Sequence, residues 1–243
     1  MKTLLILCLL LCPLPLLADL SRLEYLTEDY PPYNYQEEGK AAGLAVEILK
    51  QVWQQSGTPE QPVRVIPWAR GYYLLTQKPD VVLFSTARTT VRNPLFKWAC
   101  PIGYSEIVLL ALAKHEITLA DESALHGHSY AAVRFDVAEQ LLLNRGLDDT
   151  RIMPANRLSQ ALRLLMSGRV EMVAAGALAA RQAMKELDAD PALFQRVYTL
   201  SAEELCFAFN HAVSDETVDE FQRALTKVLA SEQYQSLYKR FFP

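Results

Sequence analysis

Arginine, aromatic and acidic side chains gather where short β-rich runs of the sequence end. Three arginines and three large aromatic residues occupy such positions in the first half of the chain: Tyr30, Tyr33, Trp68, Arg70, Arg88 and Arg92. An arginine guanidinium is a planar fork of donors that fits a carboxylate with two hydrogen bonds. Tyrosine and tryptophan rings pack on apolar or cationic groups. These residue types indicate a binding site for a small polar molecule.

The full set of candidate site residues follows the ends of the predicted strands. In the first half they are Asp29, Tyr30, Tyr33, Trp68, Arg70, Ser85, Thr86, Arg88, Thr89 and Arg92, and in the second half Arg134, Phe135, Asp136, Asn156, Ala175 and Gly176. Taken singly, each has a purely structural explanation, since Arg70 can be a solvated residue at a helix start and Trp68 can fill the core. Their collection on one rim favours a binding site.

The elements that must position these residues alternate between β-rich runs and helical patterns. We expect strands at residues 20–26, 63–66, 81–84, 107–113, 130–133, 151–153, 170–174 and 205–209. We expect helices at residues 44–55, 138–144, 158–166, 216–229 and 232–241. This alternation is typical of α/β folds with parallel sheets and crossover helices, in which ligands bind beyond the carboxyl ends of the strands. The sequence therefore predicts two α/β lobes in series.

The N-terminus has the three regions of a secretory signal. Lys2 precedes an apolar run at residues 4–11, and Leu16, Leu17 and Ala18 precede the polar Asp19. The run is interrupted by prolines and is shorter than the roughly 20 residues that a membrane-spanning helix needs. We therefore expect residues 1–18 to be a cleaved signal peptide, and the rest of the chain to be a monomer in the periplasm.

Charge and motifs exclude several classes of function. The chain has 24 basic and 28 acidic residues and a formal net charge of −4, which offers nothing to nucleic acid. His126 and His128 form the one close histidine pair, and no cysteine or acid stands at metal-ligand spacing from them. The sequence contains no nucleophile elbow, P-loop or dinucleotide fingerprint. We expect no metal, no cofactor and no nucleic-acid partner.

Several stretches resemble the extracellular solute-binding proteins of family 3, which carry amino acids to ABC importers. They are Thr-Glu-Asp-Tyr-Pro-Pro-Tyr at 27–33 followed by Gly39 and Gly43, Pro-Trp-Ala-Arg at 67–70, the run 87–92 leading to Phe-Lys-Trp at 96–98, Gly-Arg-Val-Glu at 168–171, and the terminal residues 238–242. The resemblance implies a periplasmic-binding-protein-like fold, the type II Venus flytrap. Each lobe is then a mainly parallel sheet flanked by helices, and two strands form the hinge. Lobe 1 is expected at residues 19–104 and 203–243, and lobe 2 at residues 105–202.

The resemblance also implies roles for individual residues. Arg92 matches the arginine that grips a ligand α-carboxylate, and Thr89 lies near it. Tyr30 and Trp68 match aromatic walls of the site. Residues 134–136 match a loop of the second lobe at a helix N-terminus.

One departure from the family pattern concerns the ammonium group of an amino acid. Members that bind α-amino acids usually carry an aspartate eight residues after the glycine that matches Gly168, and here that position is Gly176. Without this carboxylate a buried ammonium lacks its main counter-charge. Either Asp29 or Asp136 substitutes for it, or the ligand is an anion or a neutral molecule.

Two cysteines, Cys100 and Cys206, remain after the signal is removed. In an oxidising compartment they are either bonded or two buried thiols, because sequence alone does not give the geometry that a disulfide needs. The resemblance places them on neighbouring segments of lobe 1 near the hinge, where a disulfide could join them.

These observations favour a protein that captures a small polar solute, an amino acid or another carboxylate-bearing molecule, for an ABC importer. The expected partners are the solute and an ABC transporter permease or a membrane receptor. One alternative is an enzyme on the same fold, similar to cyclohexadienyl dehydratases, with Glu171, Glu203 or Asp136 as proton donor. The other is a sensory module for a membrane receptor. We expect a binding protein rather than an enzyme, because the sequence offers no acid pair that can be placed in the cleft.

Overall fold

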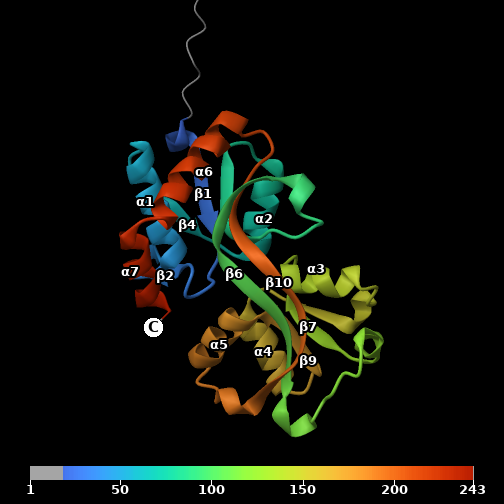
Figure 1. Cartoon of the computed structure of the whole chain (residues 1–243). Coiled ribbons are helices and arrows are strands. Elements are labelled where there is room, and N and C mark those ends of the chain that lie inside the picture. The colour runs from blue at the N-terminus through green and yellow to red at the C-terminus, as the bar shows by residue number, and fades with distance from the viewer. Residues whose placement is uncertain (1–18, 243) are drawn as a thin grey trace, which may run out of the picture.

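Two long strands connect the two lobes of the protein. The computed structural model describes residues 19–242, so the predicted signal peptide lies outside the described residues. The strands β6 (Lys97–Leu112) and β10 (Phe194–Phe209) run through both lobes (Figure 1) and pair antiparallel from Lys97 to Leu112. The chain therefore crosses between the lobes on a two-stranded ribbon.

The first lobe is built on three parallel strands. In sheet order they are β4 (Val63–Val65), β1 (Glu24–Thr27) and β5 (Val81–Ala87). The helices of this lobe are α1 (Leu44–Ser56), α2 (Trp68–Gln77), α6 (Asp215–Leu229) and α7 (Glu232–Phe241). A hairpin of β2 (Tyr35–Glu37) and β3 (Lys40–Ala42) lies at the edge. All residues of β5 are buried, which explains its continuous apolar start in the sequence.

The second lobe repeats this arrangement. Its parallel strands, in sheet order, are β9 (Met172–Gly176), β7 (Tyr130–Val133) and β8 (Ile152–Ala155). Its helices are α3 (Val137–Asn144), α4 (Leu158–Met166) and α5 (Ala177–Glu186). The complete sheet has the order β4-β1-β5-β10-β6-β9-β7-β8, in which β6 and β10 run antiparallel to their neighbours. The predicted α/β fold with two lobes of parallel strands and flanking helices is confirmed.

Short 3-10 turns link these elements. They lie at Leu20–Arg22, Asn93–Leu95, Ala113–His115, Glu122–Gly127, Asp149–Arg151 and Pro191–Leu193. Among the described residues, no helix combines the length and the apolar character needed to cross a bilayer.

Local sequence signals explain where several helices begin and end. Gly57 ends α1 with φ 67°, a left-handed conformation that glycine adopts without steric strain. Ser214 begins α6, where its hydroxyl accepts a hydrogen bond from the N–H of Thr217 at 3.2 Å. The amphipathic helix α4 buries Leu162 and Leu165 against the second-lobe sheet, and its bounds are those that the sequence predicts.

The structure corrects several of the predicted elements. The helix α2 is absent from the predicted elements; Trp68 begins it directly after Pro67, whose φ of −54° suits a helix start. Residues 20–22 form a 3-10 turn, so the first strand is shorter than expected. The strands predicted at 107–113 and 205–209 are only parts of β6 and β10. The helix α5 and the β2/β3 hairpin are absent from the sequence prediction.

A disulfide joins the two crossing strands near their first-lobe ends. Cys100 of β6 is bonded to Cys206 of β10 across a sequence separation of 106 residues, and the loop it closes contains β7, β8, β9 and α3 to α5. The side chain of Gln222 in α6 also binds the backbone of Cys100. The Cys100 N–H donates to Gln222 Oε1 at 2.7 Å, and Gln222 Nε2 donates to the Cys100 carbonyl at 2.9 Å. The ribbon is thereby anchored to the first lobe.

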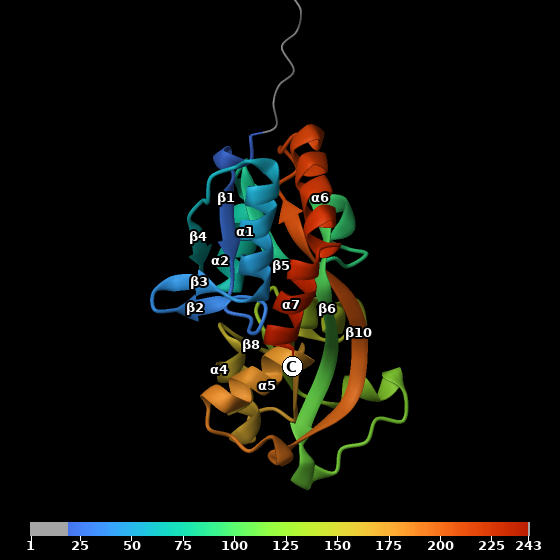
Figure 2. The same ribbon diagram turned by 60° about the vertical axis from the view of Figure 1, so that its left-hand side comes forward.

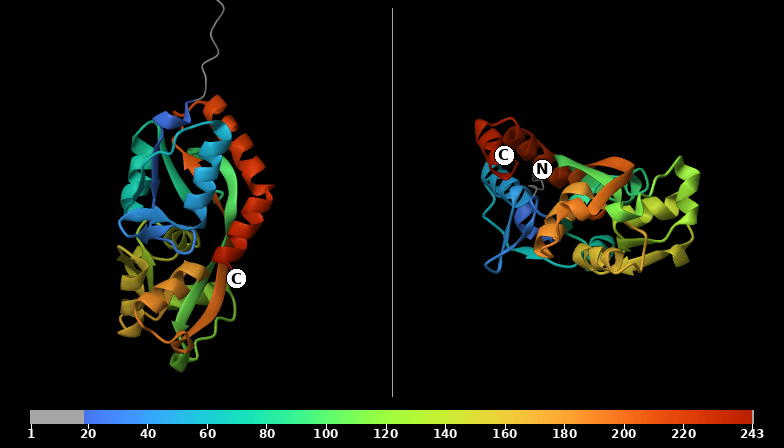
Figure 3. Two further views of the ribbon diagram at one scale, coloured as in Figure 1. Left: turned by 90° about the vertical axis from the view of Figure 1, so that its left-hand side faces the viewer. Right: turned by 90° about the horizontal axis from the view of Figure 1, so that it is seen from below.

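The C-terminal helices reinforce the first lobe from outside. Figure 2 shows α6 and α7 running down its side, and the left view of Figure 3 shows α7 ending beside the crossing strands. Phe221 of α6 is fully buried against Phe207 and Phe209 of β10, with ring centres 4.7 and 5.2 Å apart. Where one lobe ends and the other begins within β6 and β10 stays a prediction.

Candidate functional site

A cavity of about 600 Å³ lies between the two lobes. It is found beyond the carboxyl ends of β1, β4, β7 and β8, where the loops of both lobes meet. The first lobe contributes Glu28, Asp29, Tyr30, Pro31, Gln36, Val65, Ile66, Pro67 and Trp68. The second lobe contributes Val133, Asp136, Asn156, Arg157, Leu158, Ser159, Gln160, Ala174, Ala175, Gly176, Ala179, Ala183 and Glu186. This volume is that of a pocket for a small metabolite.

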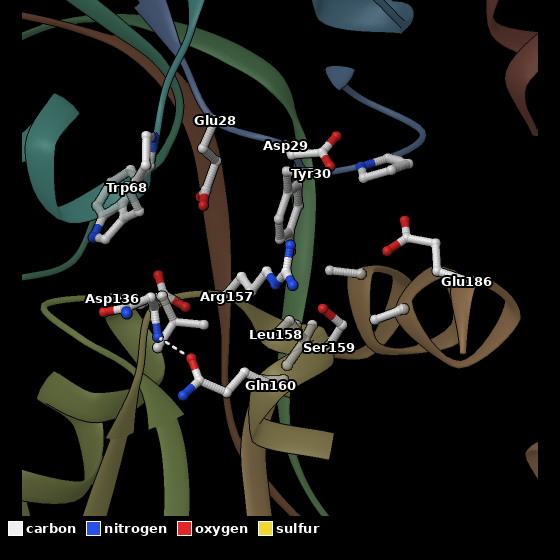
Figure 4. Close-up of a pocket in the computed structure, with 18 of the residues that line it drawn as sticks. Glu28, Asp29, Tyr30, Trp68, Asp136, Arg157, Leu158, Ser159, Gln160 and Glu186 are labelled. Atoms are coloured by element: carbon white, nitrogen blue, oxygen red, sulfur yellow. Dashed lines mark hydrogen bonds between the residues drawn. The ribbon is translucent and has the colours of Figure 1, made fainter. Parts of the chain in front are cut away.

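Carboxyl groups outnumber basic groups in this cavity. Glu28 points from the end of β1 toward the loop that carries Asp136, and Glu186 reaches in from α5 (Figure 4). Asp29 completes the acidic set, while Arg157 is the one basic side chain in the described lining. The lining therefore has an excess of potential negative charge.

The cavity walls raise the pKa of all four carboxyl groups. For Glu28, burial raises the pKa well above its usual range, and the nearby charge of Asp136 raises it further. Burial also raises the pKa of Asp136, an effect that the Arg92 guanidinium opposes. The pKa of Asp29 is raised by burial, and that of Glu186 by burial and by the charge of Asp29. The protein alone thus disfavours full ionisation of these groups.

Arg92 lies outside the lining and connects the two lobes. Its side chain is fully buried and packs on Trp68 and Tyr72, with 5.0 and 5.2 Å between the guanidinium carbon and the ring centres. Its Nε donates to Gln140 Oε1 at 2.9 Å, and its Nη2 donates to the Phe135 carbonyl at 3.1 Å. Both of these acceptors belong to the second lobe, and Nη1 donates at 3.5 Å to the Ala87 carbonyl of the first lobe, so Arg92 is bonded to both lobes.

The turn before α3 is the part of the second lobe that Arg92 and Trp68 contact. The Phe135 carbonyl also accepts a hydrogen bond from Trp68 Nε1 at 2.8 Å. Phe135 has a φ of 60°, and its N–H donates to Glu139 Oε2 at 2.5 Å. Asp136 begins α3 by accepting from the N–H of Val137 at 2.6 Å. These bonds hold the turn in the shape that meets the first lobe.

Tyr30 makes a second contact between the lobes, at Gly176. The hydroxyl groups of Tyr30 and Ser105 are hydrogen-bonded at 2.6 Å. A Cβ added at Gly176 would collide with the Tyr30 hydroxyl. The position at which the family pattern carries an ammonium-binding aspartate is therefore filled here by a tyrosine from the other lobe.

We expect Gly176→Ala to lower the free energy of unfolding by about 1–3 kcal/mol, because the methyl group overpacks the contact with Tyr30. Adding Tyr30→Phe removes the clashing hydroxyl and should recover part of the loss. Urea denaturation of the single and double variants measures both effects. Gly127→Ala is the matched control, since nothing lies within 4 Å of a Cβ there. Equal stability of Gly176→Ala and the wild type would contradict the contact.

The cavity brings together five of the predicted site residues: Asp29, Tyr30, Trp68, Asp136 and Gly176. Two further residues expected at strand ends, Asn156 and Ala175, line it as well. The other candidates lie outside the lining: Tyr33, Arg70, Ser85, Thr86, Arg88, Thr89, Arg92, Arg134 and Phe135. A ligand contact for any of these stays a prediction.

The candidates outside the cavity have structural surroundings of their own. Tyr33 borders a second, largely apolar cavity of about 470 Å³, which lies between residues 101–104 of β6 and the helix α7. Thr86 is buried, and its hydroxyl donates to the Leu83 carbonyl at 2.9 Å. The side chain of Arg88 is exposed, and its Nε donates to Asn93 Oδ1 at 2.7 Å.

Sequence reasoning missed six polar residues of the lining: Glu28, Gln36, Arg157, Ser159, Gln160 and Glu186. Glu28 directly follows β1, so the strand-end rule could have included it. Arg157, Ser159 and Gln160 surround the start of α4, where the Gln160 side chain accepts from the Asn156 N–H at 3.0 Å (Figure 4). Glu186 belongs to a helix that the sequence did not predict.

Two α/β lobes on a two-stranded ribbon, with a polar cavity between them at the strand ends, are the architecture of a solute-binding protein. The chain belongs to the bacterial extracellular solute-binding proteins, family 3, whose sequence profile matches residues 25–243. No curated protein sequence matches the chain.

Solved structures with the same fold include proteins of different roles. A histidine kinase sensor domain with similarity to periplasmic binding proteins is 20% identical, with a TM-score of 0.79 over 90% of this chain and 96% of that one. The arginine-, lysine-, histidine-binding protein ArtJ from Geobacillus stearothermophilus is 18% identical, with a TM-score of 0.76 over 90% and 95%. An ancestral arginine-binding protein bound to arginine is 19% identical, with a TM-score of 0.75 over 91% and 98%. At these identities the similarity shows the fold alone.

Proposed function

We propose that the protein is a periplasmic monomer that captures a small polar solute between its lobes and delivers it to an ABC importer. The observation that carries this proposal is the cavity of about 600 Å³ lined by polar and aromatic side chains of both lobes. A solute in it contacts both lobes at once, and such contacts stabilise the closed arrangement over an open one. Amino acids and other carboxylate-bearing molecules are the first candidates, because the similar structures include arginine-binding proteins.

Sensing is the second candidate function, and the similarity to a histidine kinase sensor domain favours it. The two functions use the same closure and differ in the membrane protein that receives the closed form. Cross-linking of the solute-loaded protein to its native membranes separates them, because the captured protein is an importer permease in one case and a receptor in the other.

Of the three acids offered as proton donors for an enzyme, only Asp136 lines the cavity, where Glu28 accompanies it; the cavity thus holds an acid pair that was not expected from the sequence. Glu171 lies outside the cavity, where it accepts from the N–H of Ser129 at 2.9 Å and contacts His128 Nδ1 at 3.0 Å. Glu203 is on β10, also outside the lining, and only Asp136 is in it. Membership of a solute-binding family fits a binding protein.

A thermal-shift screen of small metabolites tests the proposed function. A solute present at 100 times its Kd should stabilise the protein by about 2.7 kcal/mol, which raises Tm by several degrees in a domain of this size. Small-angle scattering of the same sample should show the lobes held together. A broad screen in which no solute of any charge raises Tm would count against solute capture.

A further inference from the structure

Glu28 is a half-buried acid that lines the cavity. Its side chain points into the cavity (Figure 4), and its carboxylate accepts no hydrogen bond from residues 19–242. A carboxylate that is partly removed from water and has no partner is unfavourable. It faces the loop of Asp136 from the opposite lobe, and each of two close carboxylates disfavours the charge of the other. A positive charge between the lobes would therefore stabilise the ionised forms of Glu28 and Asp136.

The protein supplies little of that charge. Arg92 lowers the pKa of both Glu28 and Asp136, yet its hydrogen bonds go to Phe135, Gln140 and Ala87, and it is not part of the cavity lining. Arg157 lines the cavity, but its charge acts on Glu186 and its side chain is exposed. An anionic solute would thus meet more carboxylates than guanidinium groups.

The two groups that the family resemblance implies for an α-amino acid are also absent from the cavity. Arg92 lies outside the lining and bonds to Gln140, Phe135 and Ala87, and Tyr30 fills the space beside Gly176. Neither an α-carboxylate clamp nor the usual ammonium-binding aspartate is presented to a solute. Recognition therefore has to come from the groups that do line the cavity.

We infer that the solute is an organic cation, an amine or a guanidine, whose positive group lies between Glu28 and Asp136, and that it needs no α-carboxylate. This inference rests on the proposed function. Tyr30 and Trp68 line the cavity from the first lobe, although the Trp68 ring is already stacked on Arg92. Ser159 and Gln160 offer polar contacts from the second lobe. Each lobe thus contributes one carboxylate, so the cation itself closes the protein.

Calorimetric titration with matched solutes tests this inference. The panel consists of agmatine and cadaverine, which are arginine and lysine without their carboxylates, then arginine and lysine themselves, and glutarate and glucose. We expect agmatine or cadaverine to bind at least as tightly as its parent amino acid, and glutarate not to bind. Binding of arginine or lysine about 100-fold tighter than the decarboxylated partner would overturn the inference, since about 2.7 kcal/mol would then come from the carboxylate.

Variants of the two acids provide the second readout. Glu28→Gln and Asp136→Asn should each weaken binding of the amine by about 10- to 100-fold, the range of a charge-assisted hydrogen bond. Asparagine keeps the acceptor for the Val137 N–H, so α3 retains its cap. Glu60→Gln, an exposed acid outside the cavity, is the control and should leave affinity unchanged. Unchanged affinity in Glu28→Gln and Asp136→Asn would contradict the inferred site.

The pH dependence of amine binding follows from the same groups. The acids Glu28, Asp29, Asp136 and Glu186 face the solute with raised pKa values, and Arg157 and Arg92 are the nearby cations. A cation favours their ionised forms, so its binding releases protons and its affinity should fall as pH is lowered from about 8 to about 5. Affinity that is constant or rises over this interval would oppose the inference.

The outcomes separate this inference from the proposed function. If a neutral or anionic solute binds and closes the lobes while no amine does, the inference fails and solute capture stands. If no solute of any class binds, solute capture fails as well.

Discussion

Replacement of Arg92 by methionine is expected to lower the free energy of unfolding by about 3 kcal/mol. The change removes the donors to Gln140 Oε1 and the Phe135 carbonyl and the stacking on Trp68 and Tyr72. It also removes the positive charge that lowers the pKa values of the two facing acids in the cavity. Because both acceptors lie in the second lobe, the lobes should separate more readily, and small-angle scattering should show a larger radius of gyration.

Arg88→Met is the matched control for this prediction. Arg88 is exposed and makes no contact with the second lobe: it donates to Asn93 and, at 3.9 Å, to Cys100 Sγ, and lies over the Trp98 ring, so its loss should change stability by no more than about 0.5 kcal/mol. Urea denaturation of both variants gives the comparison. Equal losses would contradict the role of Arg92 between the lobes. A variant Arg92→Met that keeps full stability and loses only solute binding would instead support the carboxylate clamp that the family resemblance implies.

Loss of the disulfide should have an effect of similar size. A bond that closes a loop of about 100 residues stabilises a protein by about 4 kcal/mol in the chain-entropy description, and here the separation is 106 residues. The double variant Cys100→Ser, Cys206→Ser should therefore unfold at a Tm lower by about 10 °C. Gln222 holds the backbone at Cys100 in both proteins, so the fold itself should persist.

Reduction of the wild-type protein provides the control for the disulfide prediction. A thiol reductant should lower the Tm of the wild type to that of the double variant and leave the double variant unchanged. If the Tm of the wild type does not change when the reductant can reach the disulfide during unfolding, the bond contributes little to stability.

The sequence predicts the bounds of some elements in full and of others only in part. The pattern of α4 and the apolar run of β7 give their bounds without error, because burial alone decides those residues. The crossing strands are predicted only in part. Their middle segments carry Glu203 and Glu106 on exposed faces, and Pro101 and Gly103 interrupt the apolar pattern. Pairing between β6 and β10, a long-range contact, extends both strands beyond what local residues indicate.

The site is predictable in location but not in its contacts. The rule of strand ends correctly places Asp29, Trp68 and Asp136 at one cavity, because parallel strands in both lobes point their carboxyl ends at each other. It cannot tell that Arg92 bonds to the second lobe and is not part of the lining. That outcome depends on acceptors in the second lobe, at Phe135 and Gln140, which no local pattern brings near Arg92.

Native mass spectrometry of the protein purified from its native cells tests the central claim most directly, because it detects a solute held between the lobes whatever the chemical identity of that solute. Solute capture predicts a one-to-one complex with a small molecule, which dissociates on activation to leave the free chain. Our further inference predicts that this molecule is an amine or a guanidine. A spectrum that contains only the free chain, together with a metabolite screen in which nothing raises Tm, would contradict the account.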